Sequence, residues 1–103
     1  MEDGMLKIDK TADEGKVTFT LEGRLDTLTA PDLEKKIMDS IDGISELIID
    51  FKGVDYISSA GLRVLLSSLK LMNKQGSMKV VNICEAVMEI FEVTGFTDIL
   101  TIE

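Results

Sequence analysis

The sequence predicts a single α/β domain over residues 1–103, with a mixed sheet of four to five strands and helices packed mainly on one face. Three observations predict this class. Near the N-terminus, two segments alternate apolar and polar residues with the period of half-buried antiparallel strands. Residues 46–51 contain the unbroken apolar run Leu47, Ile48 and Ile49, which suits a parallel strand covered on both faces, and residues 78–83 predict another buried strand. Other segments repeat apolar residues at the spacing of amphipathic helices.

The first two strands are expected to form an antiparallel hairpin. Their alternating apolar residues lie on either side of the turn residues 13–15 (Asp-Glu-Gly) and are Leu6, Ile8, Val17, Phe19 and Leu21. Gly23 is then expected to bend the chain toward the first helix.

The first helix is expected to begin at Thr29, a favoured N-cap residue. Leu28 and Leu33 flank this cap at the spacing of a hydrophobic staple. Residues 42–43 (Asp-Gly) are expected to end the helix. Its apolar face repeats every four residues, at Leu33, Ile37 and Ile41.

A strand, a helix and a second strand follow, and together they predict a right-handed βαβ unit. The strand 46–51 leads into an expected loop over residues 52–59, and the strand 78–83 completes the unit. Gly76 is expected to end the helix in the left-handed conformation. The apolar residues of this second helix follow i, i+3, i+4, i+7 spacing and are Leu62, Leu65, Leu66 and Leu69.

The C-terminal segment is expected to add one more helix and one more strand. The helix should cover residues 85–94 and end at Gly95, with Phe96 packed back on Phe91. Residues 98–102 (Asp-Ile-Leu-Thr-Ile) predict the last strand.

The composition excludes several classes of function. A chain of 103 residues is long enough for one core and too short for two. The absence of histidine removes histidine-based metal sites, Ser-His-Asp and Cys-His catalysis, and phosphohistidine transfer. The single Cys84 has no cysteine or histidine neighbour, so it predicts a small buried side chain rather than a redox or metal motif. We therefore expect neither a cofactor nor a metal.

The charge argues against nucleic acid and membrane partners. Nineteen acidic and eleven basic residues give a net charge of −8, which repels polynucleotides and anionic lipid surfaces. No uncharged apolar run of about 18 residues is present, and the N-terminus is acidic where a secretory signal is basic, so a cytoplasmic protein is expected. From Tyr56 to Cys84, four basic residues and no acidic one indicate either a solvated helix or a partner-facing surface.

The strongest candidate site is the segment 55–63, with the sequence DYISSAGLR. It follows a predicted parallel strand, and the carboxyl ends of such strands form the functional edge of a sheet. Ser59, or else Ser58, is expected at the N-terminus of the second helix, where an ordinary N-cap explains either serine. The same position tolerates a phosphate on Ser59, because a helix N-terminus stabilises an anion, and Arg63 can reach back to it.

This segment and GRLDTLTA at residues 23–30 together resemble the STAS domain of bacterial anti-sigma factor antagonists, over nearly the whole chain. The resemblance implies a regulatory protein and not an enzyme. Such a protein binds an anti-sigma factor that is also a serine kinase, and phosphorylation ends the association, which controls transcription that depends on a sigma factor. A PP2C-type phosphatase resets it. The family's phosphoacceptor serine lies two residues before a Gly-Leu pair, and that residue is Ser59 here, with Ser58 as the alternative phosphorylation site.

The resemblance also implies a partner surface, in which Asp26 matches a family aspartate close to the phosphorylation site. The candidate partner-binding residues are Asp26, Thr27, Tyr56, Ser58, Ser59, Gly61, Leu62 and Arg63. Two alternatives stay open. One is a STAS subunit of another complex, such as a stressosome or a lipid-transport assembly, without phosphorylation. The other is a small nucleotide-binding protein that uses the helix N-terminus as a phosphate cradle, although neither GxxxxGK[ST] nor GxGxxG is present.

Overall fold

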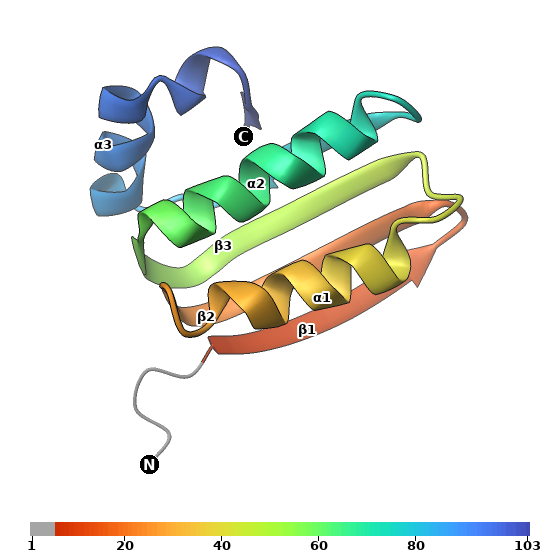
Figure 1. Ribbon diagram of the computed structural model, residues 1–103, viewed down its shortest axis with the longest axis horizontal. Helices are drawn as coiled ribbons and strands as arrows, with labels where there is room; N and C mark the ends of the chain where they lie inside the picture. The colour runs from red at the N-terminus through yellow and green to blue at the C-terminus, as the bar shows by residue number, and fades with distance from the viewer. Residues whose placement is uncertain (1–5) are drawn as a thin grey trace.

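The computed structural model describes residues 6–103, which form a five-stranded mixed sheet with helices over one face (Figure 1). The strands lie in chain order across the sheet and are β1 (Leu6–Asp13), β2 (Lys16–Leu25), β3 (Glu46–Ile57), β4 (Ser77–Val81) and β5 (Thr101–Ile102). The β1–β2 pair is antiparallel, and the other pairs are parallel. The helices are α1 (Ala30–Ser40), α2 (Ser59–Met72) and α3 (Glu85–Thr94), with a 3-10 turn at Phe96–Asp98. The predicted fold class is confirmed.

The core lies between the sheet and the helix layer. Phe19 on β2 and Leu47 and Ile49 on β3 are fully buried, and they pack in one cluster with Leu33 of α1 and Leu65 of α2. Burying a side chain of this size contributes about 1.5–3 kcal/mol. The cluster therefore fixes both helices on the sheet. Within residues 6–103, no helix is long and apolar enough to cross a membrane. The acidic N-terminal segment includes positions 1–5, which lie outside the described residues.

The hairpin is confirmed, and its turn is tight. Glu14 and Gly15 connect β1 to β2 with φ angles of 47° and 85°, the left-handed pair that matches the twist of a two-residue hairpin. The bend expected at Gly23 does not lead the chain out of the sheet toward the first helix. Gly23 stays within β2 with a φ angle of 124°, next to a register shift against β3, so the bend is a bulge inside the sheet.

The first helix begins where the sequence predicts, but its cap differs in two respects. Thr29 occupies the N-cap position, yet its side chain makes no capping hydrogen bond to the helix. The predicted staple between Leu28 and Leu33 is wrong, because Leu28 is 82% exposed while Leu33 is buried. The predicted apolar face is confirmed, since Leu33, Ile37 and Ile41 are all buried.

The loop predicted over residues 52–59 is wrong, because β3 continues to Ile57. The second half of β3 pairs with the end of β2, and Val54 and Ile57 are buried there. Gly53 allows this pairing, since a Cβ atom at that position would lie 2.9 Å from the Cα atom of Glu22. The polar residues of segment 52–57 therefore belong to a strand with a bulge and not to a loop.

The helix α2 is present, but Gly76 has a different role from the predicted one. Asn73 caps the helix in a right-handed conformation, and Gly76 has no positive φ angle. A Cβ atom on Gly76 would lie 1.9 Å from the Ser45 carbonyl oxygen, so close backbone approach requires glycine there. The buried face is also rotated from the predicted one, because Leu62 and Leu66 are only half-buried. The fully buried face comprises Gly61, Val64, Leu65, Ser68, Leu69 and Met72.

The C-terminal elements match the sequence in type and differ in length. The helix α3 ends at Gly95, which has a φ angle of 82°, and Phe96 stacks on Phe91 with ring centroids 6.1 Å apart. The strand β4 ends at Val81, two residues early, because Asn82 turns into the left-handed region with a φ angle of 58°. The strand expected over 98–102 retains two residues, since a 3-10 turn takes up its first part.

Candidate functional site

The two serines of the candidate segment lie where β3 turns directly into α2. Ser58 occupies the N-cap position, with extended backbone angles, and its N–H donates to the Leu25 carbonyl at 2.9 Å. Ser59 is the first residue of the helix, and its side chain is exposed. The cap expected first at Ser59 is therefore at Ser58, the alternative residue. The Ser58 hydroxyl oxygen is buried without a hydrogen-bond partner in the described part of the chain.

Asp26 organises the turn between β2 and α1. Its carboxylate accepts hydrogen bonds from the N–H groups of Leu28 at 3.0 Å and Thr29 at 3.1 Å. The Thr29 hydroxyl donates to the Arg24 carbonyl at 2.7 Å and accepts from the Asp26 N–H at 2.9 Å. These bonds close the turn on itself, which explains why the Thr29 side chain does not cap α1. The turn is thus held by hydrogen bonds within its own residues.

The same contacts set the acidity of Asp26. Partial burial raises the pKa of this carboxyl, but the hydrogen bonds from Thr29 and Leu28 outweigh it, and the nearby positive charge of Arg24 adds to their effect. The pKa of Asp26 therefore lies below its ordinary value, and the side chain is a stable carboxylate at neutral pH. Its side chain is 19% exposed, so most of its surface faces the turn rather than solvent.

Arg24 and Tyr56 form an exposed pair beside this turn, and reasoning from the sequence missed Arg24. The two residues are partners in the β2–β3 register, and the guanidinium carbon of Arg24 lies 4.2 Å from the centroid of the Tyr56 ring. The Arg24 Nε atom also lies 3.6 Å from an Asp26 carboxylate oxygen. Arg24 lies within the motif GRLDTLTA, but only the pairing of β2 with β3 shows that its side chain lies over Tyr56.

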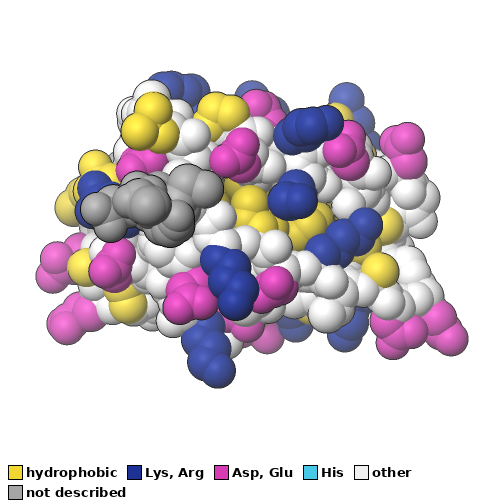
Figure 2. Space-filling model, turned by 90° about the horizontal axis from the view of Figure 1, so that it is seen from below, with side chains coloured by type: hydrophobic (Ala, Val, Ile, Leu, Met, Phe, Trp, Pro, Cys, Tyr) yellow, Lys and Arg dark blue, Asp and Glu magenta, His cyan; other side chains and the backbone are white. Residues whose placement is uncertain are grey.

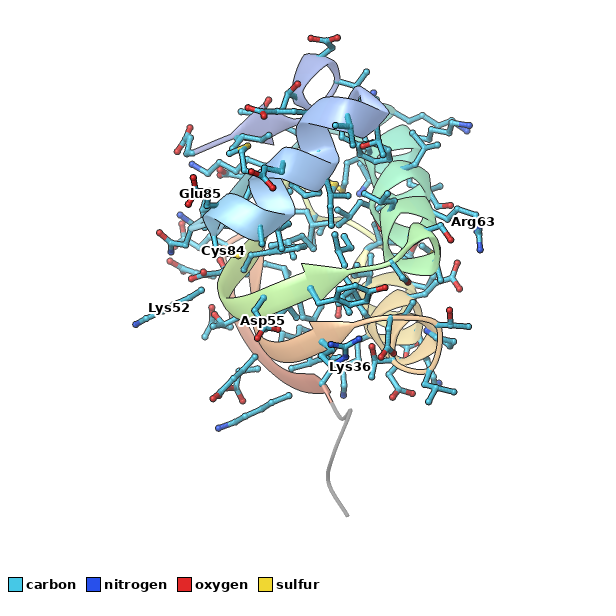
Figure 3. All side chains as sticks on the ribbon, turned by 90° about the vertical axis from the view of Figure 1, so that its left-hand side faces the viewer. Lys36, Lys52, Asp55, Arg63, Cys84 and Glu85 are labelled. Atoms are coloured by element: carbon cyan, nitrogen blue, oxygen red, sulfur yellow. The ribbon has the colours of Figure 1, made fainter. Side chains whose placement is uncertain are left out.

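An open groove of about 400 Å³ separates the N-terminal halves of α1 and α2. Thr27 and Arg63 both line it, and Figure 3 shows the Arg63 side chain extending from α2 into solvent. The lining residues are Thr27, Ala30, Pro31, Glu34, Ala60, Arg63, Val64 and Ser67. Leu28 presents an exposed apolar side chain on the same turn as Thr27, and reasoning from the sequence had assigned it to the helix cap.

Two of the candidate partner-binding residues are buried or half-buried. Gly61 is buried, and a Cβ atom there would lie 2.8 Å from both Leu25 Cγ and Ile57 Cγ1. Leu62 is half-buried and packs against the core. These two residues position α2 against the sheet, whereas the exposed candidates are Thr27, Tyr56, Ser59 and Arg63.

The comparison with known protein families decides the identity of the fold. The sequence model of the STAS domain matches residues 7–103. The chain belongs to the STAS domain family. This family is non-catalytic, which agrees with the expectation that the protein is not an enzyme.

Several proteins similar to this STAS domain are described as anti-sigma factor antagonists. The anti-sigma-B factor antagonist of Bacillus subtilis is 32% identical over 98 residues, which cover 94% of this chain and 90% of the relative. An anti-sigma factor antagonist from Mycobacterium paratuberculosis superimposes with a TM-score of 0.85 at 24% identity, covering 94% of this chain and 84% of that chain. SpoIIAA in its unphosphorylated form superimposes with a TM-score of 0.82 at 18% identity, covering 94% of this chain and 88% of that chain. The phosphorylated form of SpoIIAA, described as a Bacillus cell fate determinant, superimposes with a TM-score of 0.73 at 17% identity, covering 95% of this chain and 90% of that chain.

The surface of residues 6–103 away from α2 and the Asp26 turn includes a further groove and the cysteine Cys84. A second groove of about 290 Å³ lies between β1 and α1, with Leu6 and Ile8 among its lining residues, and Figure 2 shows basic and acidic side chains interspersed on this side of the molecule. The prediction that Cys84 is buried is wrong, because it is exposed at the residue before α3. Among residues 6–103, no group of three or more acidic or cysteine side chains is placed to hold a metal ion.

Proposed function

We propose that this protein is an anti-sigma factor antagonist, which binds an anti-sigma factor serine kinase when unphosphorylated and is released when Ser59 is phosphorylated. The names of its relatives support the first part, because the Bacillus subtilis relative is an anti-sigma-B factor antagonist. The structural neighbour SpoIIAA supports the second, since it occurs in an unphosphorylated and a phosphorylated form. Sigma factors act on RNA polymerase, so the proposal places the protein in the cytoplasm.

The exposed hydroxyl of Ser59 at the first position of α2 is the observation that carries the proposal. The kinase transfers the γ-phosphoryl group of ATP to Ser59 Oγ, the hydroxyl proton leaves, and ADP is released. A PP2C-type phosphatase hydrolyses the ester and restores the serine. A phosphate here lies at the positive end of the helix dipole, so it leaves α2 intact while adding a charge of about −1.5 to −2. The change is confined to the surface.

The surroundings of Ser59 support a protein partner. The Asp26 turn is held by its own hydrogen bonds, and Tyr56 is held by the Arg24 side chain above its ring. A surface that is ordered in advance loses less conformational entropy on association. Leu28 and Tyr56 are 82% and 37% exposed, and a protein partner that covers these side chains would remove apolar surface from water.

The direct test combines the purified protein with ATP and the serine-kinase anti-sigma factor encoded beside its gene, and maps phosphate by mass spectrometry. We expect label on Ser59, no label in Ser59→Ala, and normal labelling in Ser58→Ala, which is the matched control because Ser58 Oγ is buried. An unmodified Ser59, under conditions that label a known antagonist, overturns the proposal. That outcome favours a non-phosphorylated STAS subunit of a stressosome or lipid-transport assembly.

A further inference from the structure

Arg63 is an exposed cation without an ion pair within residues 6–103, although the chain carries nineteen acidic residues. It extends from α2 into solvent (Figure 3). Arg24, the other arginine of the chain, is already engaged by the Asp26 carboxylate at 3.6 Å and by the ring of Tyr56. Arg63 therefore has a guanidinium that is free to bind a new anion.

The helix directs Arg63 toward Ser59. The two residues are four apart on α2, so they are neighbours on one face of the helix. Helical side chains point back toward the N-terminus, which places the Arg63 side chain over the turn that contains Ser59. An acidic group that precedes a basic one by four residues is also the favourable order of such a pair.

We propose that Arg63 binds the phosphate on Ser59 and so determines how the phosphorylated surface differs from the unphosphorylated one. The proposal rests on Ser59 being the modified residue in the proposed function. Guanidinium and phosphate form two parallel charge-assisted hydrogen bonds, which lysine cannot reproduce.

The contact changes the groove as well as the helix end. In the unphosphorylated protein, Arg63 is the basic residue and Glu34 the acidic residue of the groove lining. When the phosphate captures Arg63, the positive charge of the groove is neutralised while Glu34 remains. A partner carboxylate that paired with Arg63 would lose its counter-charge at the moment when the phosphate adds negative charge nearby.

The test needs neither the kinase nor the partner. Phosphoserine is incorporated at position 59 of the full chain by an expanded genetic code, and the second ionisation of the phosphate is followed by ³¹P NMR titration. We expect the pKa of the phosphate, near 6 for an isolated phosphoserine, to be about 0.2–0.7 unit lower in the wild type than in Arg63→Gln. The difference should shrink in 1 M salt, because the pair is exposed.

Two further variants sharpen the outcome. Lys70→Gln removes a positive charge from the same helix eleven positions after residue 59, and it should leave the phosphate pKa unchanged. Arg63→Lys should give a smaller shift than arginine. Equal phosphate pKa values in the wild type and Arg63→Gln overturn the inference, whatever the kinase assay shows. A shift that depends on Arg63, with no kinase labelling of Ser59, instead overturns the proposed function and leaves the contact standing.

Discussion

Replacing Asp26 with alanine tests whether the turn before α1 is held by its own side chain. The change removes the acceptor for the N–H groups of Leu28 and Thr29. Leu28 is exposed, so water replaces its hydrogen bond, whereas Thr29 is 3% exposed and its N–H loses a partner in the interior. An unpaired buried donor costs about 1–3 kcal/mol. We expect Asp26→Ala to lower the free energy of unfolding by about 2 kcal/mol, or Tm by roughly 8–16 °C.

The asparagine variant separates the acceptor from the charge. Asn keeps an oxygen that can accept both N–H groups, so Asp26→Asn should cost less than half as much as Asp26→Ala at pH 7. The folded-state pKa of Asp26 is depressed, so ionisation stabilises the fold above the unfolded value of about 3.9, and this stabilisation is lost as the pH falls through the folded value. The advantage of the wild type over Asp26→Asn should therefore disappear in acid.

Urea denaturation between pH 2.5 and pH 7, with equal m-values as the check on two-state behaviour, measures both effects. Asp39→Ala is the matched control, because Asp39 forms an exposed pair with Lys35 at 3.5 Å and should contribute about 0.5 kcal/mol or less. The reasoning fails if Asp26→Ala is as stable as the control. It fails in a different way if Asp26→Asn is as unstable as Asp26→Ala, since the charge and not the acceptor would then hold the turn.

Three further substitutions, with Val93→Ser as a control, address the surface and its support. Leu28→Ser should leave thermal unfolding unchanged and weaken binding to the anti-sigma factor at least tenfold in calorimetry, whereas Val93→Ser, at the similarly exposed Val93 on α3, should leave the affinity unchanged. Gly61→Ala should lose about 1–2 kcal/mol in urea denaturation, because overpacking against Leu25 and Ile57 exceeds the gain in helix propensity. Ser58→Ala should be neutral or stabilising in the same assay, since its hydroxyl is buried without a partner, and a loss above 1 kcal/mol would show that it does cap α2.

Hydrophobic periodicity predicted the number, type and order of the main elements, because each buried face leaves a repeat in the sequence. It failed in the second half of β3, where Gly53 and Asp55 interrupt the apolar run and resemble a loop. The second half of β3 is a strand because β2 pairs with it, and the apolar pattern of one segment does not show which segment lies beside it. The predicted staple at Leu28 was wrong because a local hydrogen-bonded turn overrides the apolar spacing. The spacing of Leu28 from Leu33 is that of a staple, but the hydrogen bonds of Asp26 hold the turn so that Leu28 points outward.

The position of the candidate phosphoacceptor depends on the register between β2 and β3. Leu25 pairs with Ile57, the last residue of β3. The Leu25 carbonyl accepts a hydrogen bond from the N–H of Ser58, the residue that follows. Gly61 in the first turn of α2 packs against the side chains of Leu25 and Ile57. Ser58 is therefore held at the N-cap position of α2, and the next residue, Ser59, is exposed to solvent. Because the Asp26 turn leaves the sheet at the same pair, one strand register places both halves of the candidate surface. A slip of one residue would exchange the faces of the strand. Substitutions at this strand pair should therefore alter partner binding even though Leu25 and Ile57 are buried.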